Sequence, residues 1–90
     1  MPQQVNGLHD NIEQMTNSKK SIVRALVAIY HELSPEQIER LSNDSDSNVR
    51  AAIATYHTLT DVQIERLAND SVKKIRDIII KKYPLIGEIK

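Results

Sequence analysis

The chain has 90 residues, 12 of them basic and 12 acidic, so its formal net charge is zero; 40% of its residues are hydrophobic, and its only aromatics are three tyrosines. The absence of cysteine excludes disulfides, thiolate metal sites, iron–sulfur clusters and cysteine nucleophiles. Since no secretion signal and no stretch long enough to span a bilayer occurs, we expect one cytoplasmic domain, residues 1–90, without membrane contact.

A period of 26 residues runs through the chain. Gln-Ile-Glu-Arg-Leu occurs at 37–41 and again at 63–67, and a weaker first copy places Val-Arg-Ala at 23–25 one period before Val-Arg-Ala at 49–51. A fixed period of this length is typical of stacked supersecondary units, each of which needs its neighbours to bury its apolar face. We therefore expect repeats at about 7–32, 33–58 and 59–84, with a C-terminal cap at 85–90.

Each repeat is predicted to hold two short helices, of which the first begins at a capping box. Ser34 and Thr60 stand where a hydroxyl can cap a helix, and a glutamine follows each of them three residues later. Pro35 takes the first helical position, where its missing N–H costs nothing. Isoleucine and leucine three positions apart predict the buried face of this helix: Ile38, Leu41, Ile64 and Leu67.

An asparagine follows the first helix in every repeat. These residues are Asn17, Asn43 and Asn69. Because asparagine tolerates the left-handed conformation that ends helices, we expect them to reverse the chain. A role for them in binding a ligand is the alternative.

The second helix is predicted to begin near Asp46 in the middle repeat. Val72 stands in that column in the third repeat, so we expect the cap to move to Ser71. Apolar residues at i, i+3, i+4 and i+7 predict one buried stripe: Val23, Leu26, Val27 and Tyr30; Val49, Ala52, Ile53 and Tyr56; Ile75, Ile78 and Ile79. Since no segment alternates with period two, we expect an all-α fold.

The third repeat differs from the others at Ile80, which replaces Ala28 and Ala54 of the same column. A small residue there would let a following repeat approach closely. The end of a stack must cover its last apolar face, so we expect a cap over Ile78 and Ile80 made by Leu85, Ile86 and Ile89. The alternative to this monomer is a weak homodimer through an exposed apolar edge.

The segment Asp-Ser-Asp-Ser-Asn-Val-Arg-Ala-Ala-Ile-Ala at 44–54, with Leu-Thr and Gln-Ile-Glu-Arg-Leu-Ala within 59–68, resembles the leucine-rich repeat variant and, more loosely, HEAT-type helical repeats. The resemblance covers nearly the whole chain, from about Leu8 to Pro84. It implies a right-handed α-solenoid of about three two-helix repeats, sometimes with one segment as a 3₁₀-helix, that serves as a protein-binding surface. The iron–sulfur module of some members needs cysteines that this chain lacks, so we expect no cofactor.

In HEAT-like repeats, an aspartate and an arginine at matching columns form hydrogen-bonded ladders between neighbouring units. The resemblance implies this structural role for Arg24, Arg50 and Arg76 with Asp44 and Asp70, beside the asparagine column. Arginine suits it because its guanidinium binds carboxylates and carbonyls in a planar, bidentate way. The alternative is an arginine stripe that binds an acidic or phosphate ligand.

Two columns at the end of the second helix are candidate contacts for a partner. Tyr30 and Tyr56 lie one period apart, as do His31 and His57. Aromatic columns supply area and hydrogen bonds at binding faces. The alternatives are core packing for the tyrosines and C-terminal helix capping for the histidines. A metal site made by the histidines and Glu32 is disfavoured because their spacing matches no standard ligand pattern.

The charge is unevenly distributed along the chain. Residues 32–70 hold eight acids and three bases, whereas residues 71–90 hold six bases and two acids. The basic end could hold a nucleic-acid backbone through Lys73, Lys74, Arg76, Lys81 and Lys82. The acidic centre would repel a long duplex, so nucleic acid is the less favoured partner.

No catalytic motif occurs in the sequence. It has no nucleophile elbow, no HExxH and no glycine-rich phosphate loop. Glu39 and Glu65 stand beside Arg40 and Arg66, and we interpret them as ordinary solvated ion pairs. We therefore expect a non-enzymatic adaptor or inhibitor that binds a protein, without metal or cofactor, and nucleic-acid binding through the basic end is the alternative.

Overall fold

The computed structural model describes residues 11–84. Within this range the chain folds into helices and no strand is present, which confirms the all-α prediction for this part. The helices are a segment at 11–16, α2 (Ser21–Tyr30), α3 (Pro35–Ser42), α4 (Ser47–Tyr56), α5 (Asp61–Ala68) and α6 (Lys73–Lys82).

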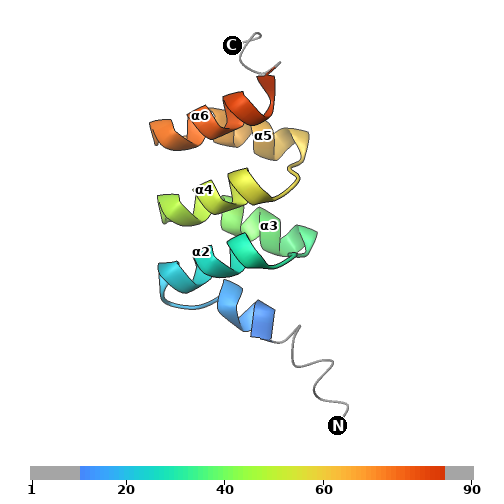
Figure 1. Ribbon diagram of the computed structural model, residues 1–90, viewed down its shortest axis with the longest axis vertical. Helices are drawn as coiled ribbons and strands as arrows, with labels where there is room; N and C mark the ends of the chain where they lie inside the picture. Colours follow the sequence, from blue (N-terminus) through green and yellow to red (C-terminus); the bar gives the residue numbers. More distant parts are fainter. Residues whose placement is uncertain (1–10, 85–90) are drawn as a thin grey trace.

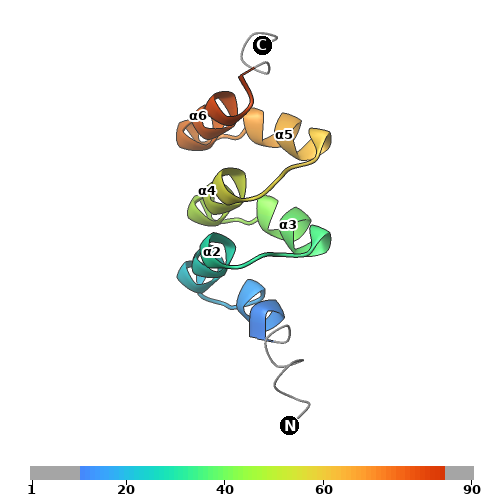
Figure 2. The same ribbon diagram turned by 45° about the vertical axis from the view of Figure 1, so that its right-hand side comes forward.

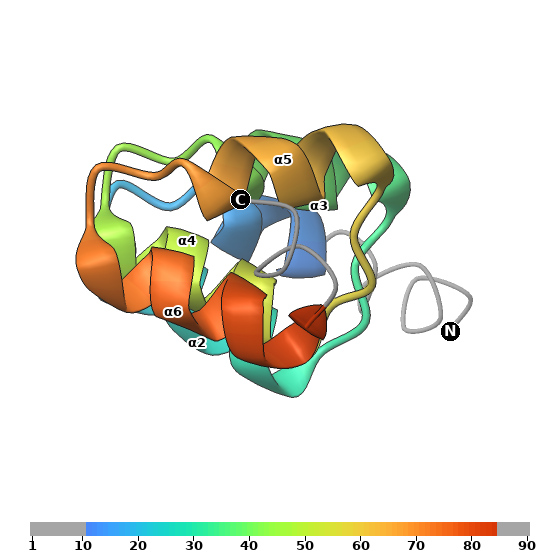
Figure 3. The same cartoon turned by 90° about the horizontal axis from the view of Figure 1, so that it is seen from above.

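The helices form two layers along one long axis. One layer consists of α2, α4 and α6, one above another, and the other contains α3 and α5 (Figure 1). Turning the molecule by 45° keeps these two columns apart (Figure 2), and the view from above superposes α2, α4 and α6 on one side and α3 and α5 on the other (Figure 3). The molecule measures 53 × 22 × 17 Å, so it is elongated along the stacking axis.

The first helix of each later repeat begins at a capping box, as predicted. The Ser34 hydroxyl accepts a hydrogen bond from the Gln37 backbone N–H, and the Gln37 side chain accepts one from the Ser34 N–H. Thr60 and Gln63 make the same pair of bonds at α5. Pro35 occupies the first turn of α3. These bonds satisfy backbone donors that a helix start leaves without an intrahelical partner.

The second helices begin in two different ways. Asp46 caps α4 as predicted, accepting from the N–H groups of Asn48 and Val49. The prediction that the cap of α6 moves to Ser71 is wrong, because Val72 is the N-cap residue and no side chain bonds that end. The carboxylate of Asp70 accepts from the Val72 N–H and so fixes the turn that leads into the helix.

The asparagine column ends the first helices through its side chains. Asn43 and Asn69 are C-cap residues with φ of −107° and −111°. No described residue has a positive φ. The prediction of a left-handed backbone is therefore wrong. Each asparagine amide instead donates to the carbonyl four residues earlier, as Asn17 does to Glu13. Because the side chain satisfies this carbonyl, the backbone need not turn left-handed.

The core lies between the two layers. Its fully buried residues include Val27, Ala28, Leu41, Val49, Ile53, Ala54, Leu67, Ile75 and Ile79. The predicted stripe is wrong at Leu26, Tyr30 and Tyr56, which are 45%, 74% and 57% exposed. The reason is that α4 packs against α2, α3 and α6. The buried side of the second helices is therefore the side that carries Ala28 and Ala54, and not the side that carries Leu26 and the two tyrosines.

Close packing between neighbouring second helices depends on that alanine column. Ala28 and Ala54 have no exposed surface, whereas Ile80 of the same column is 43% exposed. A residue without a side chain beyond Cβ leaves room for the next helix to approach. The predicted cap of Leu85, Ile86 and Ile89 lies outside the described residues.

Candidate functional site

The arginine column joins each repeat to the next. Arg24 Nε and Nη2 donate to the two carboxylate oxygens of Asp44 over 2.8 and 3.0 Å, and Nη1 donates to the Ser18 carbonyl over 2.7 Å. Arg50 repeats this pattern with Asp70 at 2.8 and 3.1 Å and with the Asp44 carbonyl at 2.7 Å. The structure thus places these residues in a ladder inside the stack, so their side chains are not available as an open anion-binding stripe.

The Arg50–Asp70 pair is mostly shielded from solvent, with side-chain exposures of 14% and 8%. Burial alone would raise the pKa of Asp70, but hydrogen bonds from Arg50 and from the Val72 N–H outweigh it, so the pKa lies below its ordinary value. The carboxylate therefore stays ionised inside the stack. The same pair raises the pKa of Arg50, chiefly through its hydrogen bond to Asp70.

We expect the stabilisation by Asp70 to depend on pH. Because the pKa of Asp70 is lowered on folding, its contribution is fully present above the unfolded-state pKa of about 3.9 and is lost as the pH falls through the folded-state value. Urea unfolding of the wild type and of Asp70→Asn, followed by helical circular dichroism, should show a stability difference at neutral pH that shrinks below about pH 4. A difference that stays constant into acid would show that the charge of Asp70 contributes nothing.

A second ladder joins the first helices and was missed in the sequence. Gln63 Nε2 donates to Glu39 Oε1 over 2.9 Å, and Arg66 donates to the Ser42 hydroxyl over 3.0 Å. Arg66 also forms an ion pair with Glu39 at 3.2 Å. Gln37, Arg40, Glu13 and Thr16 make the corresponding contacts one repeat earlier.

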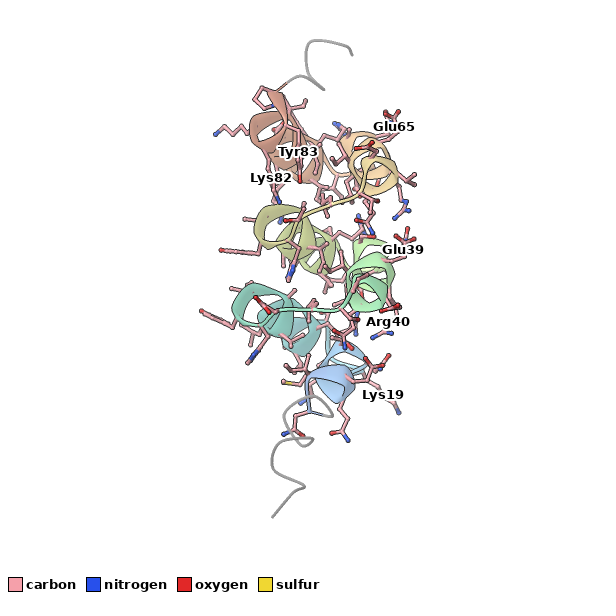
Figure 4. The ribbon with its side chains drawn as sticks, turned by 90° about the vertical axis from the view of Figure 1, so that its right-hand side faces the viewer. Lys19, Glu39, Arg40, Glu65, Lys82 and Tyr83 are labelled. Atoms are coloured by element: carbon pink, nitrogen blue, oxygen red, sulfur yellow. The ribbon has the colours of Figure 1, made fainter. Side chains whose placement is uncertain are left out.

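Figure 4 shows Glu39, Arg40 and Glu65 along the edge formed by the first helices. The hydrogen bond from Gln63 is the main cause of a lowered pKa at Glu39, with Arg66 adding to it. Glu39 and Arg66 form a partly solvated ion pair, with exposures of 51% and 34%, but the expectation that each pairs with its neighbour in the sequence is wrong, because they pair between adjacent repeats. The identical Gln and Glu columns were the signal that could have revealed this ladder.

His57 and Lys82 bind the carbonyls at the end of the preceding second helix. His57 Nε2 lies 2.7 Å from the Ala28 carbonyl oxygen, and because a carbonyl only accepts, this nitrogen carries the proton. One period later, Lys82 donates to the carbonyls of Ala54 and His57. Partial burial lowers the pKa of Lys82, which lies beside Tyr83 in Figure 4. Both side chains therefore have a structural contact between repeats.

Tyr30 and Tyr56 border a continuous pair of grooves. The larger, of about 500 Å³, lies between α2 and α4 and has no charged lining residue; it is lined by Ser21, Ile22, Ala25, Leu26, Ile29, Asn48, Ala51, Ala52, Thr55 and Tyr56. The smaller, of about 370 Å³, shares Ile29 and Tyr56 with it and also takes in Tyr30, His31 and His57. The structure thus brings together all four predicted aromatic and histidine residues at one end of the α2–α4 face.

Along the column that begins at Ile22, this face changes in polarity from one second helix to the next. Ile22 is 62% exposed on α2, while the same column holds Asn48 on α4 and Lys74 on α6. The outer face therefore changes from apolar at α2 to charged at α6. We call the larger groove the α2–α4 groove; Tyr56 lines it, and Tyr30 lines the smaller groove beside it.

Most of the predicted basic residues of α6 have partners within the protein. Lys73 pairs with Asp77 at 2.8 Å, and Lys74 donates to Asn48 Oδ1 over 3.0 Å. Arg76 donates to the Asp70 carbonyl, and Lys82 is bound as described above. Lys81 is exposed on the same helix. The structure thus gives most of these charges a contact within the protein, although Lys73 and Lys74 also remain exposed.

Among residues 11–84, no group of three or more His, Asp or Glu side chains is placed to hold a metal ion, and this includes His31, His57 and Glu32. None of the helices described is both long and apolar enough to cross a bilayer.

Comparisons with known proteins assign no family to this chain. No protein-family model, curated protein or solved structure matches it. Its function must therefore be inferred from its own surfaces.

Proposed function

We propose that this chain is a non-enzymatic protein-binding module that works as a small cytoplasmic adaptor or inhibitor. Its scaffold is a monomeric right-handed α-solenoid of about three two-helix repeats, similar to the leucine-rich repeat variant or HEAT-like repeats. Support for the scaffold comes from contacts that recur every 26 residues, since Arg24–Asp44 and Arg50–Asp70 have the same geometry. Neither ladder contains a group set up for catalysis or for holding a cofactor.

The α2–α4 groove is the observation that carries this proposal. Its lining is uncharged, and its lining residues Ile22, Leu26 and Tyr56 are all at least 45% exposed; Tyr30, 74% exposed, lines the adjoining smaller groove. A contiguous apolar surface on a small protein marks an interaction site. Interface cores are depleted in charge and enriched in tyrosine, because tyrosine supplies a large apolar area and a polar tip at little cost in conformational entropy. A partner protein with an apolar surface, such as one side of an amphipathic helix, fits this groove best.

Nucleic-acid binding through the basic end is less well supported. Affinity for a duplex depends on several free cations that each displace counterions from phosphates. Of the predicted cations, Lys73 is paired with Asp77, and Lys82 is held by two carbonyls of the protein itself. Binding a duplex would break these contacts.

We expect Leu26→Ser to reduce partner capture about tenfold, because it removes apolar contact area at the centre of the groove. The matched control is Val62→Ser, since Val62 is 68% exposed on α5, in the other layer. Both variants and the wild type would be tagged and incubated with native extract, with and without nuclease, at low and moderate salt. Equal recovery by the two variants, or recovery of nucleic acid that salt removes, would contradict the proposal.

A further inference from the structure

Arg76, at the α6 end of the stack, is an arginine of the ladder without a carboxylate. Its Nη1 donates to the Asp70 carbonyl over 2.7 Å, as Arg24 and Arg50 donate to the equivalent carbonyls of their own repeats. No hydrogen bond or ion pair of Arg76 Nε or Nη2 is made within residues 11–84. The guanidinium is therefore already held in place on one side, while no residue among 11–84 binds its two-donor edge.

The protein itself shows, at two other places, what this edge binds. The same edges of Arg24 and Arg50 each hold an aspartate that lies 20 residues further along the chain. Each of these aspartates, Asp44 and Asp70, also accepts from the backbone N–H two residues later, so it sits in a tight turn before a helix. Within residues 11–84, no aspartate takes the corresponding place against Arg76.

An apolar surface adjoins this two-donor edge. Ile80, one helical turn after Arg76, is 43% exposed in the column where Ala28 and Ala54 have no exposed surface. Ile78 and Ile80 line a shallow groove of about 360 Å³ together with Asp77 and Lys81. A guanidinium next to an apolar side chain can bind the beginning of a helix that carries a carboxylate and a small apolar residue.

We propose that the α6 end docks a helical segment of a partner protein, whose aspartate, in a turn just before the helix, binds Arg76 in the bidentate way of Asp44 and Asp70. The helix that follows this aspartate lies over Ile80. This surface is at the end of the stack and is separate from the α2–α4 groove, so the two proposals can fail independently.

The charges of α6 favour an acidic partner over a second copy of this chain. Head-to-tail stacking would bring the N-terminal end of another copy onto α6, where Ser18 occupies the aspartate column and Lys19 and Lys20 are exposed beside it. That contact would offer no carboxylate in the aspartate column and would place lysines against the lysines of α6. Tail-to-tail stacking would set one Arg76 against another. Like charges across a contact disfavour both arrangements.

The test follows the side-chain Nε–H of Arg76 by NMR in the full chain. Arg24 and Arg50 serve as internal references, because their Nε–H groups are hydrogen-bonded to carboxylates and should exchange slowly with water. The probe is a synthetic peptide that copies residues 33–58 and so carries Asp44 in its turn; its matched control carries Asp44→Asn. We expect the first peptide, at about 1 mM, to make the Arg76 Nε–H exchange as slowly as the references.

The Asp44→Asn peptide should bind about tenfold more weakly, and Arg76→Lys in the protein should cause the same loss, because lysine cannot make the bidentate contact. The proposal would be overturned if the peptide bound without slowing exchange of the Arg76 Nε–H, or if neither substitution weakened its binding. If the peptide does not bind, the same 26 residues are appended after Pro84, which removes the cost of association. An Arg76 Nε–H that is still fast in this extended chain would also overturn it.

Two further samples identify other occupants. Protection of the Arg76 Nε–H that rises with protein concentration alone would show that a second copy occupies the edge. Protection by a short DNA duplex but not by the peptide, with steep loss in salt, would assign the edge to phosphate. Either result would overturn the proposal of an aspartate-bearing partner.

Discussion

Replacing Ile53 by alanine is expected to lower the free energy of unfolding by about 3 to 4 kcal/mol. Ile53 is completely buried in α4, the central helix of its layer, which contacts α2, α3 and α6. The loss combines the transfer of the removed carbons to water with the cavity that they leave. Since each repeat relies on its neighbours to cover its apolar face, a cavity at the centre weakens the whole stack. Urea unfolding followed by helical circular dichroism measures the effect.

Ile22→Ala is the control for this substitution. Ile22 is also an isoleucine on a second helix, but it is 62% exposed. Its replacement should change stability by no more than about 0.5 kcal/mol. Similar losses at positions 22 and 53 would mean that the second helices do not pack as described.

Arg50→Ala is expected to cost about 2 to 3 kcal/mol of stability. The substitution leaves the Asp70 carboxylate, which is 8% exposed, without its guanidinium and leaves the Asp44 carbonyl without its donor. Removing one partner of a shielded pair costs more than the pair contributes, because the remaining charge stays poorly hydrated. Thermal unfolding should show a fall in Tm of about 10 °C or more.

Arg76→Ala is the matched control because Arg76 makes the same bond to a backbone carbonyl but binds no carboxylate within the described chain. Arg76→Ala should lower the free energy of unfolding by only about 1 kcal/mol. The difference between the losses of stability in Arg50→Ala and Arg76→Ala measures the contribution of the bidentate contact with Asp70. Equal losses would show that this contact does not stabilise the stack.

Local sequence signals predicted the helix starts well. Ser34 with Gln37, Thr60 with Gln63, and Asp46 all cap helices as their positions predict. Capping involves side chains and backbone groups within three residues of each other, so the sequence alone contains all of its determinants. The boundaries of α3, α4 and α5 follow directly from these residues.

Features that depend on neighbouring repeats were harder to predict. The spacing of apolar residues in the second helices predicts one apolar stripe. It does not show which side of that stripe the neighbouring helices cover. For this reason Leu26, Tyr30 and Tyr56 were wrongly assigned to the core. The α2–α4 groove follows from that packing. Likewise, the Gln63–Glu39 contact joins two polar residues 24 positions apart, which resemble ordinary surface residues until the repeats are stacked.

The measurement that tests the proposed function most directly is site-specific photo-crosslinking. A photoreactive amino acid replaces Tyr56 at the border of the α2–α4 groove in one sample and Val62 on α5 in the other; both positions are more than half exposed. Each tagged protein is irradiated in nuclease-treated native extract. A protein-binding groove predicts a discrete protein adduct from position 56 that is absent from position 62. The same adducts from both positions, or none from position 56, would contradict it.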